Sequence, residues 1–102
     1  MPGSQDFAAD PRNADLPIYL NGALVPRAEA KVSVFDAGFV LGDGVWEGLR
    51  LHKGRLVFLK AHLDRLYWGL DKIQLDLGLT PAELTAEIWK LLNANRKGGR
   101  GP

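Results

Sequence analysis

The hydrophobic period of the chain changes at Leu59, and this change limits the fold more than any other feature. From there, apolar residues recur at alternating spacings of four and three residues: Leu59, Leu63, Leu66, Leu70 and Ile73. This spacing places them on one face of a helix, so the pattern predicts a helix over residues 59–76. Gly78 is predicted to form its C-terminal cap, since glycine readily adopts the left-handed conformation found there.

A second helix is predicted to begin at TPAE (80–83). Thr80 suits the N-cap, Pro81 the first helical position, and Glu83 can reach back to close a capping box. The helix should end near residues 96–98. Its apolar face would be formed by Leu84, Ile88, Leu91 and Leu92.

Before Leu59 the sequence is typical of short strands joined by tight turns. Asn21-Gly22 lies between two apolar runs in residues 18–25 and predicts a hairpin, because both central residues of a type I′ turn need a positive φ. Lys53-Gly54 predicts a second hairpin, which joins strands over residues 45–51 and 55–59.

One further strand is predicted at AKVSVF (30–35), where apolar and polar residues alternate. The glycine-punctuated residues 36–44 are interpreted as a loop with a turn of helix. Strands followed by two helices predict an α+β fold, in which an antiparallel sheet of short hairpin-linked strands packs with the helices.

The ends of the chain differ from its centre in composition. Residues 1–16 and 98–102 are rich in proline, glycine and small or charged residues, and we expect a disordered leader and tail. Residues 17–97 are expected to form one domain. No signal peptide or membrane-length apolar run is recognisable, so the predicted location is the cytoplasm.

Charge and cysteine content exclude several classes of function. The net charge of +1, from 13 basic and 12 acidic residues, gives no basis for binding nucleic acid or an anionic membrane. The absence of cysteine excludes disulfides, thiolate ligands and a cysteine nucleophile. His52 and His62 are the two histidines, and they do not predict a metal site.

The stretch LGDGVWEGLRLHKG (41–54) is rich in glycine, but it does not fit a nucleotide-binding loop. Gly42, Gly44 and Gly48 give G-x-G-x-x-x-G, one residue longer than the dinucleotide fingerprint, and they precede a strand and not a helix. They are interpreted as turn residues and as a point of close backbone approach.

Arg65 borders the apolar stripe of the first predicted helix, and two roles are open to it. Arginines in such positions usually extend to solvent or pair with an acid, here Asp64 or Glu47. The alternative is an anion clamp, because a guanidinium can bind phosphate through two parallel hydrogen bonds.

Four segments occur in a characteristic order and spacing: YLNG (19–22), AKVSVFDAGFVLGDGVWEGLR (30–50), GRLVFL (54–59) and HLDRL (62–66). Together they resemble the amino-terminal small domain of class IV, fold-type IV, pyridoxal-phosphate-dependent aminotransferases. That group includes branched-chain aminotransferases, D-amino acid aminotransferases and aminodeoxychorismate lyase. The resemblance covers about residues 18–96. It implies transfer of an amino group between an amino acid and a 2-oxo acid, with pyridoxal 5′-phosphate as cofactor.

The resemblance also assigns roles to five residues. Arg65 matches the arginine that binds the cofactor phosphate. Trp46 matches an aromatic residue of the substrate pocket, and Gly48 leaves room for a substrate side chain. Arg50 lies near the pocket, on the same strand face as Trp46 and Gly48 by period-two spacing, with the intervening Glu47 facing the other way. Leu41 stands at a substrate-pocket position where branched-chain enzymes usually have tyrosine.

No catalytic residue is assigned, because the resemblance implies that the lysine forming the Schiff base lies in a second domain beyond residue 102. We therefore expect a truncated family member with an incomplete small domain, inactive as a 102-residue chain and homodimeric in its full-length form. The alternative is a non-catalytic fragment or self-associating interaction module, with Trp68 and Trp89 as interface anchors.

The substrate expectation is divided. The stretch GVWEGLR (44–50) favours branched-chain amino acids, whereas Leu41 and FVLGDG (39–44) favour D-amino acids or aminodeoxychorismate.

Overall fold

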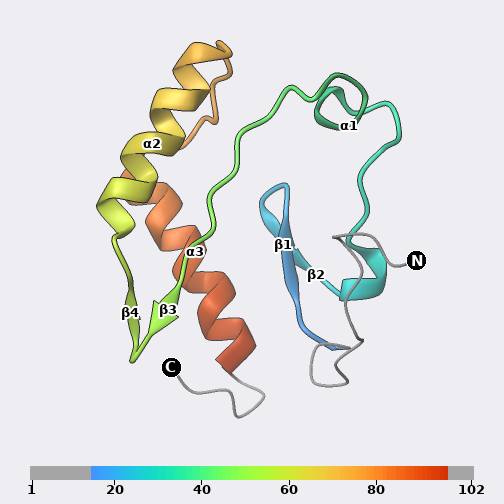
Figure 1. Ribbon diagram of the computed structural model, residues 1–102. Helices are drawn as coiled ribbons and strands as arrows, with labels where there is room; N and C mark the ends of the chain where they lie inside the picture. Colours follow the sequence, from blue (N-terminus) through green and yellow to red (C-terminus); the bar gives the residue numbers. More distant parts are fainter. Residues whose placement is uncertain (1–14, 97–102) are drawn as a thin grey trace, which may run out of the picture. The chain divides into compact units, whose positions relative to one another are not determined.

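The computed structural model describes residues 15–96 (Figure 1). The chain divides into two compact units, Met1–Lys31 and Val32–Pro102, which are described separately. The predicted tail, residues 98–102, lies outside the described residues, as does the predicted leader except for residues 15 and 16.

The first unit contains the hairpin predicted around Asn21-Gly22. Strands β1 (Ile18–Leu20) and β2 (Ala23–Val25) pair antiparallel, with Ile18 opposite Val25. The φ angles of Asn21 and Gly22 are 51° and 87°, both positive as a type I′ turn requires. The 3₁₀ turn η2 (Arg27–Glu29) follows the hairpin.

The second unit contains the other predicted hairpin, in a shorter form than expected. Strands β3 (Leu51–His52) and β4 (Arg55–Leu56) pair antiparallel across Lys53-Gly54, whose φ angles are 50° and 77°. One further hydrogen bond, from Val57 N–H to the carbonyl of Arg50 at 2.9 Å, continues the ladder. The hairpins form two separate two-stranded sheets, so the α+β class is confirmed and the single sheet is not seen.

Two predicted strands do not form. Within residues 15–96, the segment 30–35 and residues 45–49 of the strand predicted at 45–51 belong to no strand ladder, and Val32 and Val34 are both exposed. Alternating side chains favour an extended backbone, but a strand also needs a partner backbone to accept its hydrogen bonds. The described residues supply no such partner, so the prediction of these strands was wrong.

Between these segments lies α1 (Ala37–Leu41), the turn of helix predicted within the glycine-rich loop. Asp36 is its N-cap, and its carboxylate accepts a hydrogen bond from Gly38 N–H at 2.9 Å. Gly42 ends the helix in the left-handed conformation, with a φ angle of 73°.

Helix α2 (Leu59–Lys72) carries the predicted apolar stripe as far as Leu70, while Ile73 lies just after the helix and is 39% exposed. Among the described residues, Leu63 and Leu70 are the buried apolar side chains, each 6% exposed. The helix ends before the predicted residue 76. Its cap is a Schellman motif around Gln74 (φ 56°), in which Leu75 N–H donates to the carbonyl of Leu70 at 2.9 Å.

Gly78 therefore does not cap α2, contrary to the prediction. Its φ angle is 78°, so it does adopt the left-handed conformation that suggested this role. It lies in the loop after the helix, where its N–H donates to the carboxylate of Asp76 at 2.8 Å. The local preference of glycine was identified correctly, but the end of the helix was set by bonds within the preceding turn.

Helix α3 (Pro81–Arg96) begins with the predicted capping box. Thr80 N–H donates to the Glu83 carboxylate at 2.9 Å, and Glu83 N–H donates to the Thr80 hydroxyl at 3.1 Å. The hydroxyl of Tyr67 on α2 donates to the carbonyl of Leu79 at 2.6 Å, which joins α2 to the start of α3. No helix in the described part of the chain is long and apolar enough to cross a membrane.

The apolar interior lies where the segment before β3 meets α2 and α3. Its side chains line an open hollow of about 350 Å³ formed by Gly44, Val45, Leu66, Leu70, Leu75, Leu77 and Leu84. Gly69 permits the close approach of this segment to α2, because a Cβ there would lie 2.9 Å from Cγ1 of Val45. This contact places residues 45–48 beside the helix that carries Arg65.

Candidate functional site

The site begins with an alternation of exposure along residues 45–51. Val45, Glu47, Leu49 and Leu51 are partly buried, whereas Trp46, Gly48 and Arg50 are exposed. The predicted period of two is therefore confirmed as a pattern of exposure, although the segment pairs with no other strand. Glu47 faces α2, and its side chain is only 8% exposed.

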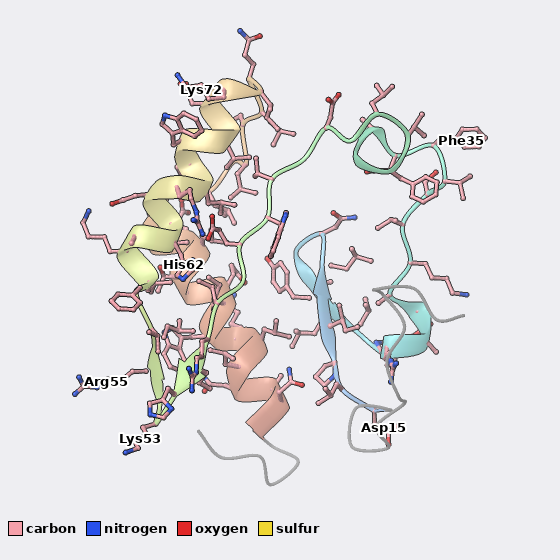
Figure 2. The ribbon with its side chains drawn as sticks, viewed as in Figure 1. Asp15, Phe35, Lys53, Arg55, His62 and Lys72 are labelled. Atoms are coloured by element: carbon pink, nitrogen blue, oxygen red, sulfur yellow. The ribbon has the colours of Figure 1, made fainter. Side chains whose placement is uncertain are left out.

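The Glu47 carboxylate joins two side chains of α2. Its Oε2 accepts from Nε of Arg65 at 2.6 Å, and its Oε1 accepts from Nη2 of the same arginine at 2.7 Å. The Oε1 atom also lies 2.6 Å from Nδ1 of His62, which Figure 2 labels. We call these three residues the Glu47 cluster.

Helix geometry explains why His62 and Arg65 meet one carboxylate. Residues three apart lie on the same face of a helix, so both can reach across to the segment that carries Glu47. Of the two acids proposed from the sequence as partners of Arg65, Glu47 is the one bound. Asp64 instead pairs with Lys60 at 2.7 Å, one turn earlier on α2.

The cluster fixes the charge of Glu47. Hydrogen bonds from Arg65 and then His62 lower the pKa of Glu47 from 4.5 to about 2, and these bonds outweigh the opposing effect of burial. An ionised carboxylate can only accept hydrogen bonds, so Nδ1 of His62 must be the donor in its contact. The same carboxylate raises the pKa of Arg65 above its ordinary value.

Part of the Arg65 guanidinium is left for another ligand. Glu47 uses Nε–H and one N–H of Nη2. The guanidinium has five N–H donors, so the two on Nη1 and the second on Nη2 remain, and within residues 15–96 they have no acceptor. The side chain of Arg65 is 69% exposed, so these donors can be reached from solvent.

An open hollow of about 580 Å³ borders the cluster. Its wall is made by residues 45–48 and one face of α2, and consists of Val45, Trp46, Glu47, Gly48, Arg65, Leu66, Trp68 and Gly69. It combines a cation that has free donors with two indole rings and two glycines. Such a wall can bind a small anion that carries an aromatic or apolar group.

Comparison with known proteins identifies the relatives of this chain. No protein-family profile matches it. It is 45% identical over 78 residues to a Methanocaldococcus jannaschii protein provisionally named a branched-chain-amino-acid aminotransferase, a match covering 76% of this chain and 27% of the relative. It is 40% identical over 78 residues to a D-alanine aminotransferase of Staphylococcus haemolyticus, and this match covers 76% of this chain and 28% of the relative. A branched-chain-amino-acid aminotransferase-like protein of Arabidopsis thaliana is 40% identical to this chain over 85 residues, which are 83% of this chain and 15% of the relative.

The chain is homologous to part of these aminotransferases. The resemblance stated from the sequence is thereby confirmed. The chain spans no more than 28% of the length of these three relatives.

Within this aminotransferase segment, the structure brings together three of the five residues that the resemblance assigned. Arg65, Trp46 and Gly48 all line the larger hollow. Leu41 and Arg50 do not: Leu41 is the exposed last residue of α1, and Arg50 is exposed just before β3. The roles of all five residues stay predictions.

Glu47 and His62 are the members of the site that the sequence did not assign. Their signal was present but weak. His62 precedes Arg65 by three residues, which places both on one helix face, and Glu47 was one of two acids considered as a partner. Only the folded chain shows that one carboxylate serves both side chains.

Proposed function

We propose that this chain contributes to a class IV pyridoxal-phosphate-dependent aminotransferase and that Arg65 binds the phosphate of the cofactor. One observation carries the proposal. The guanidinium of Arg65 stands on the wall of a hollow, held on one edge by Glu47, with its other donors open to an anion. A phosphate monoester suits that arrangement, because its oxygens can accept two parallel N–H bonds.

The residues of the hollow fit the phosphate end of pyridoxal 5′-phosphate. Arg65 would offset its negative charge and set its position, while Trp46 and Gly48 would border the space next to it. When bound, this cofactor supplies the electron sink that amino-group transfer needs. The five lysines in the described range, Lys31, Lys53, Lys60, Lys72 and Lys90, lie off the wall of this hollow. The proposal therefore takes the lysine that reacts with the cofactor from outside residues 15–96.

The substrates proposed are an amino acid and a 2-oxo acid, with branched-chain amino acids preferred over D-amino acids and aminodeoxychorismate. GVWEGLR (44–50) supports this preference, and Leu41 opposes it. Named relatives include both branched-chain and D-alanine aminotransferases, so relatives of both kinds agree with the broader reaction. A cytoplasmic homodimer for the full-length enzyme, and inactivity of the 102-residue chain alone, belong to the same proposal.

Binding of a phosphorylated cofactor form tests the role of Arg65. Pyridoxamine 5′-phosphate and pyridoxamine are suitable probes, because neither has an aldehyde that would react with surface lysines. Trp46 and Trp68 on the wall should report binding through their fluorescence. We expect the phosphorylated form to bind at least about tenfold more tightly, since charge-assisted hydrogen bonds to the phosphate are lost in the other.

Two variants complete this test. Arg65→Met should remove the preference for the phosphorylated probe. Lys60→Met is the matched control, because it removes a cation from the same helix that is paired with Asp64 and lies off the hollow. Equal affinity for the two probes in the unaltered chain, or the same behaviour in both variants, would contradict the proposal.

A second candidate function is a non-catalytic, self-associating module. Of the two expected anchors, Trp68 favours it because its large apolar side chain is exposed, whereas Trp89 is partly buried. Trp46, which is also exposed, favours it as well.

A further inference from the structure

We infer that Glu47 is the positioning residue of the anion site: it holds one edge of the Arg65 guanidinium, so that the opposite edge is oriented for phosphate before a ligand arrives. This inference rests on the proposed function of Arg65. It gives a specific role to Glu47, which the sequence had suggested as one of two acidic partners for Arg65.

The contact between Arg65 and Glu47 is bidentate. Nε and Nη2 of Arg65 donate to the two carboxylate oxygens at 2.6 and 2.7 Å. Two parallel bonds fix the plane of the guanidinium as well as its position, which one bond would not do. The edge formed by Nη1 and the second N–H of Nη2 is then the edge that stays open.

Arg65 needs such a partner because it is a long and largely exposed side chain. At 69% exposure it has few packing contacts to select one rotamer. A ligand that bound a mobile arginine would have to order it, and binding would weaken by that entropy cost. Glu47 orders the side chain in advance.

Glu47 can do this because it is itself held in place. Its side chain is 8% exposed, and His62, on the first turn of α2, donates a second hydrogen bond to Oε1 at 2.6 Å. Its backbone is drawn close to α2 by the contact between Val45 and Gly69. The carboxylate is therefore a fixed acceptor, anchored both in its own segment and on the helix.

A competing role makes the opposite prediction. If Glu47 were only a negative charge beside the site, it would repel phosphate, and its removal would strengthen binding. If it positions Arg65, its removal weakens binding.

The test uses the full 102-residue chain with Glu47→Gln and, as a matched control, Asp64→Asn. Asp64 is a carboxylate on α2, the helix that carries Arg65, and it pairs with Lys60 and not with Arg65. The first readout needs no ligand: the Nε–H resonance of Arg65 in ¹⁵N NMR spectra, assigned by its loss in Arg65→Lys. The second readout is the affinity for inorganic phosphate and for pyridoxamine 5′-phosphate.

We expect Glu47→Gln to remove the protected Nε–H resonance and to weaken both ligands about tenfold, as expected for loss of a charge-assisted hydrogen-bonded pair. Asp64→Asn should keep the resonance and the affinity. Persistence of the resonance in Glu47→Gln, or an affinity equal to or above that of the unaltered chain, would overturn the inference.

A second variant distinguishes loss of Arg65 positioning from a general loss of folding in Glu47→Gln. Glu47→Asp keeps the charge but shortens the side chain by one methylene group. Positioning predicts weakened binding in this variant too, whereas a simple effect of charge predicts unaltered affinity. Dispersed backbone amide resonances would show that each variant is folded.

The two hypotheses fail in different ways. If Arg65→Met abolishes binding while both Glu47 variants bind normally, the phosphate role of Arg65 stands and the positioning role of Glu47 falls. If Arg65→Met binds pyridoxamine 5′-phosphate as well as the unaltered chain, the proposed function falls. In that case the Nε–H resonance still decides whether Glu47 holds Arg65.

Discussion

Glu47 keeps its charge although little of its side chain reaches solvent. Burial alone would raise the pKa of a carboxyl group, since the charged form loses hydration. Here the hydrogen bonds from Arg65 and His62 prevail and bring the pKa to about 2. A carboxylate with two such donors stays ionised near neutral pH, so we expect the Glu47 cluster to be intact there.

The depressed pKa of Glu47 predicts how stability changes in acid. Because the folded pKa lies below the ordinary value of 4.5, ionisation of Glu47 stabilises the folded chain fully above that value. This contribution is lost as the pH falls from 4.5 towards 2. We expect ¹³C NMR of the Glu47 carboxyl group to show a midpoint near 2.

Comparison of unfolding free energies provides a second measurement of the same effect. The difference in unfolding free energy between the unaltered chain and Glu47→Gln should narrow as the pH falls from 4.5 towards 2. A titration midpoint of the Glu47 carboxyl group near pH 4.5 would show that the Glu47 cluster does not form in solution.

At the scale of elements, the two X-Gly turns, the capping box of α3 and the turn at α1 were all predicted from the sequence. Each depends on interactions within about four residues, such as the paired bonds between Thr80 and Glu83. The strand predicted at 30–35 and the first part of the strand predicted at 45–51 failed for the opposite reason. A strand is completed by another segment, and the pattern of one segment does not reveal whether a partner is present.

The C-terminal cap of α2 provides a prediction at this scale. Gln74 has a φ angle of 56°, in the left-handed region where a side chain is disfavoured and glycine is the usual residue. We expect Gln74→Gly to raise the free energy of unfolding by about 0.5–1 kcal/mol, after allowance for the greater freedom of glycine in the unfolded chain. Denaturant-induced unfolding followed by circular dichroism measures this change.

A matched control lies in the following loop. Gly78 has a φ angle of 78°, and a Cβ at this position would meet no atom within 4 Å. Gly78→Ala should therefore lower stability through backbone strain alone, by about 1 kcal/mol. A loss of stability in Gln74→Gly would show that the Gln74 side chain makes a contribution that its backbone conformation conceals.

At the scale of the whole chain, residues 32–46 expose an unusual amount of apolar surface. Phe35, which Figure 2 labels, is 87% exposed, and Phe39 is 70% exposed. Val32, Val34, Val40, Leu41 and Trp46 are exposed as well. Monomeric soluble proteins rarely leave large apolar patches in contact with water. This stretch therefore offers exposed apolar side chains that association of the chain could bury.

We therefore expect the 102-residue chain to self-associate as its concentration rises. Burying a phenylalanine is worth about 1.5–3 kcal/mol, so replacing both Phe35 and Phe39 by serine should weaken association by more than about tenfold. Sedimentation velocity over a concentration series measures the change. Leu24→Ser, on the first hairpin, is the control for loss of one exposed apolar side chain outside this stretch.

A chain that stays monomeric at high concentration would contradict this expectation and would also remove the self-associating module as a candidate function. The aminotransferase proposal would be unaffected, because it rests on the hollow beside Arg65.

The sequence by itself determined the local structure and the family. Period, turn pairs and capping residues act between near neighbours, and they specified both hairpins, α1, the start of α3 and the main span of α2. Tertiary structure alone decided which acid binds Arg65, because Glu47 and Arg65 lie 18 residues apart and meet only when the segment before β3 packs against α2. Gly69 allows that approach, and the choice of Glu47 over the adjacent Asp64 follows from it. The site is thus a property of packing, whereas the elements that carry it are properties of local sequence.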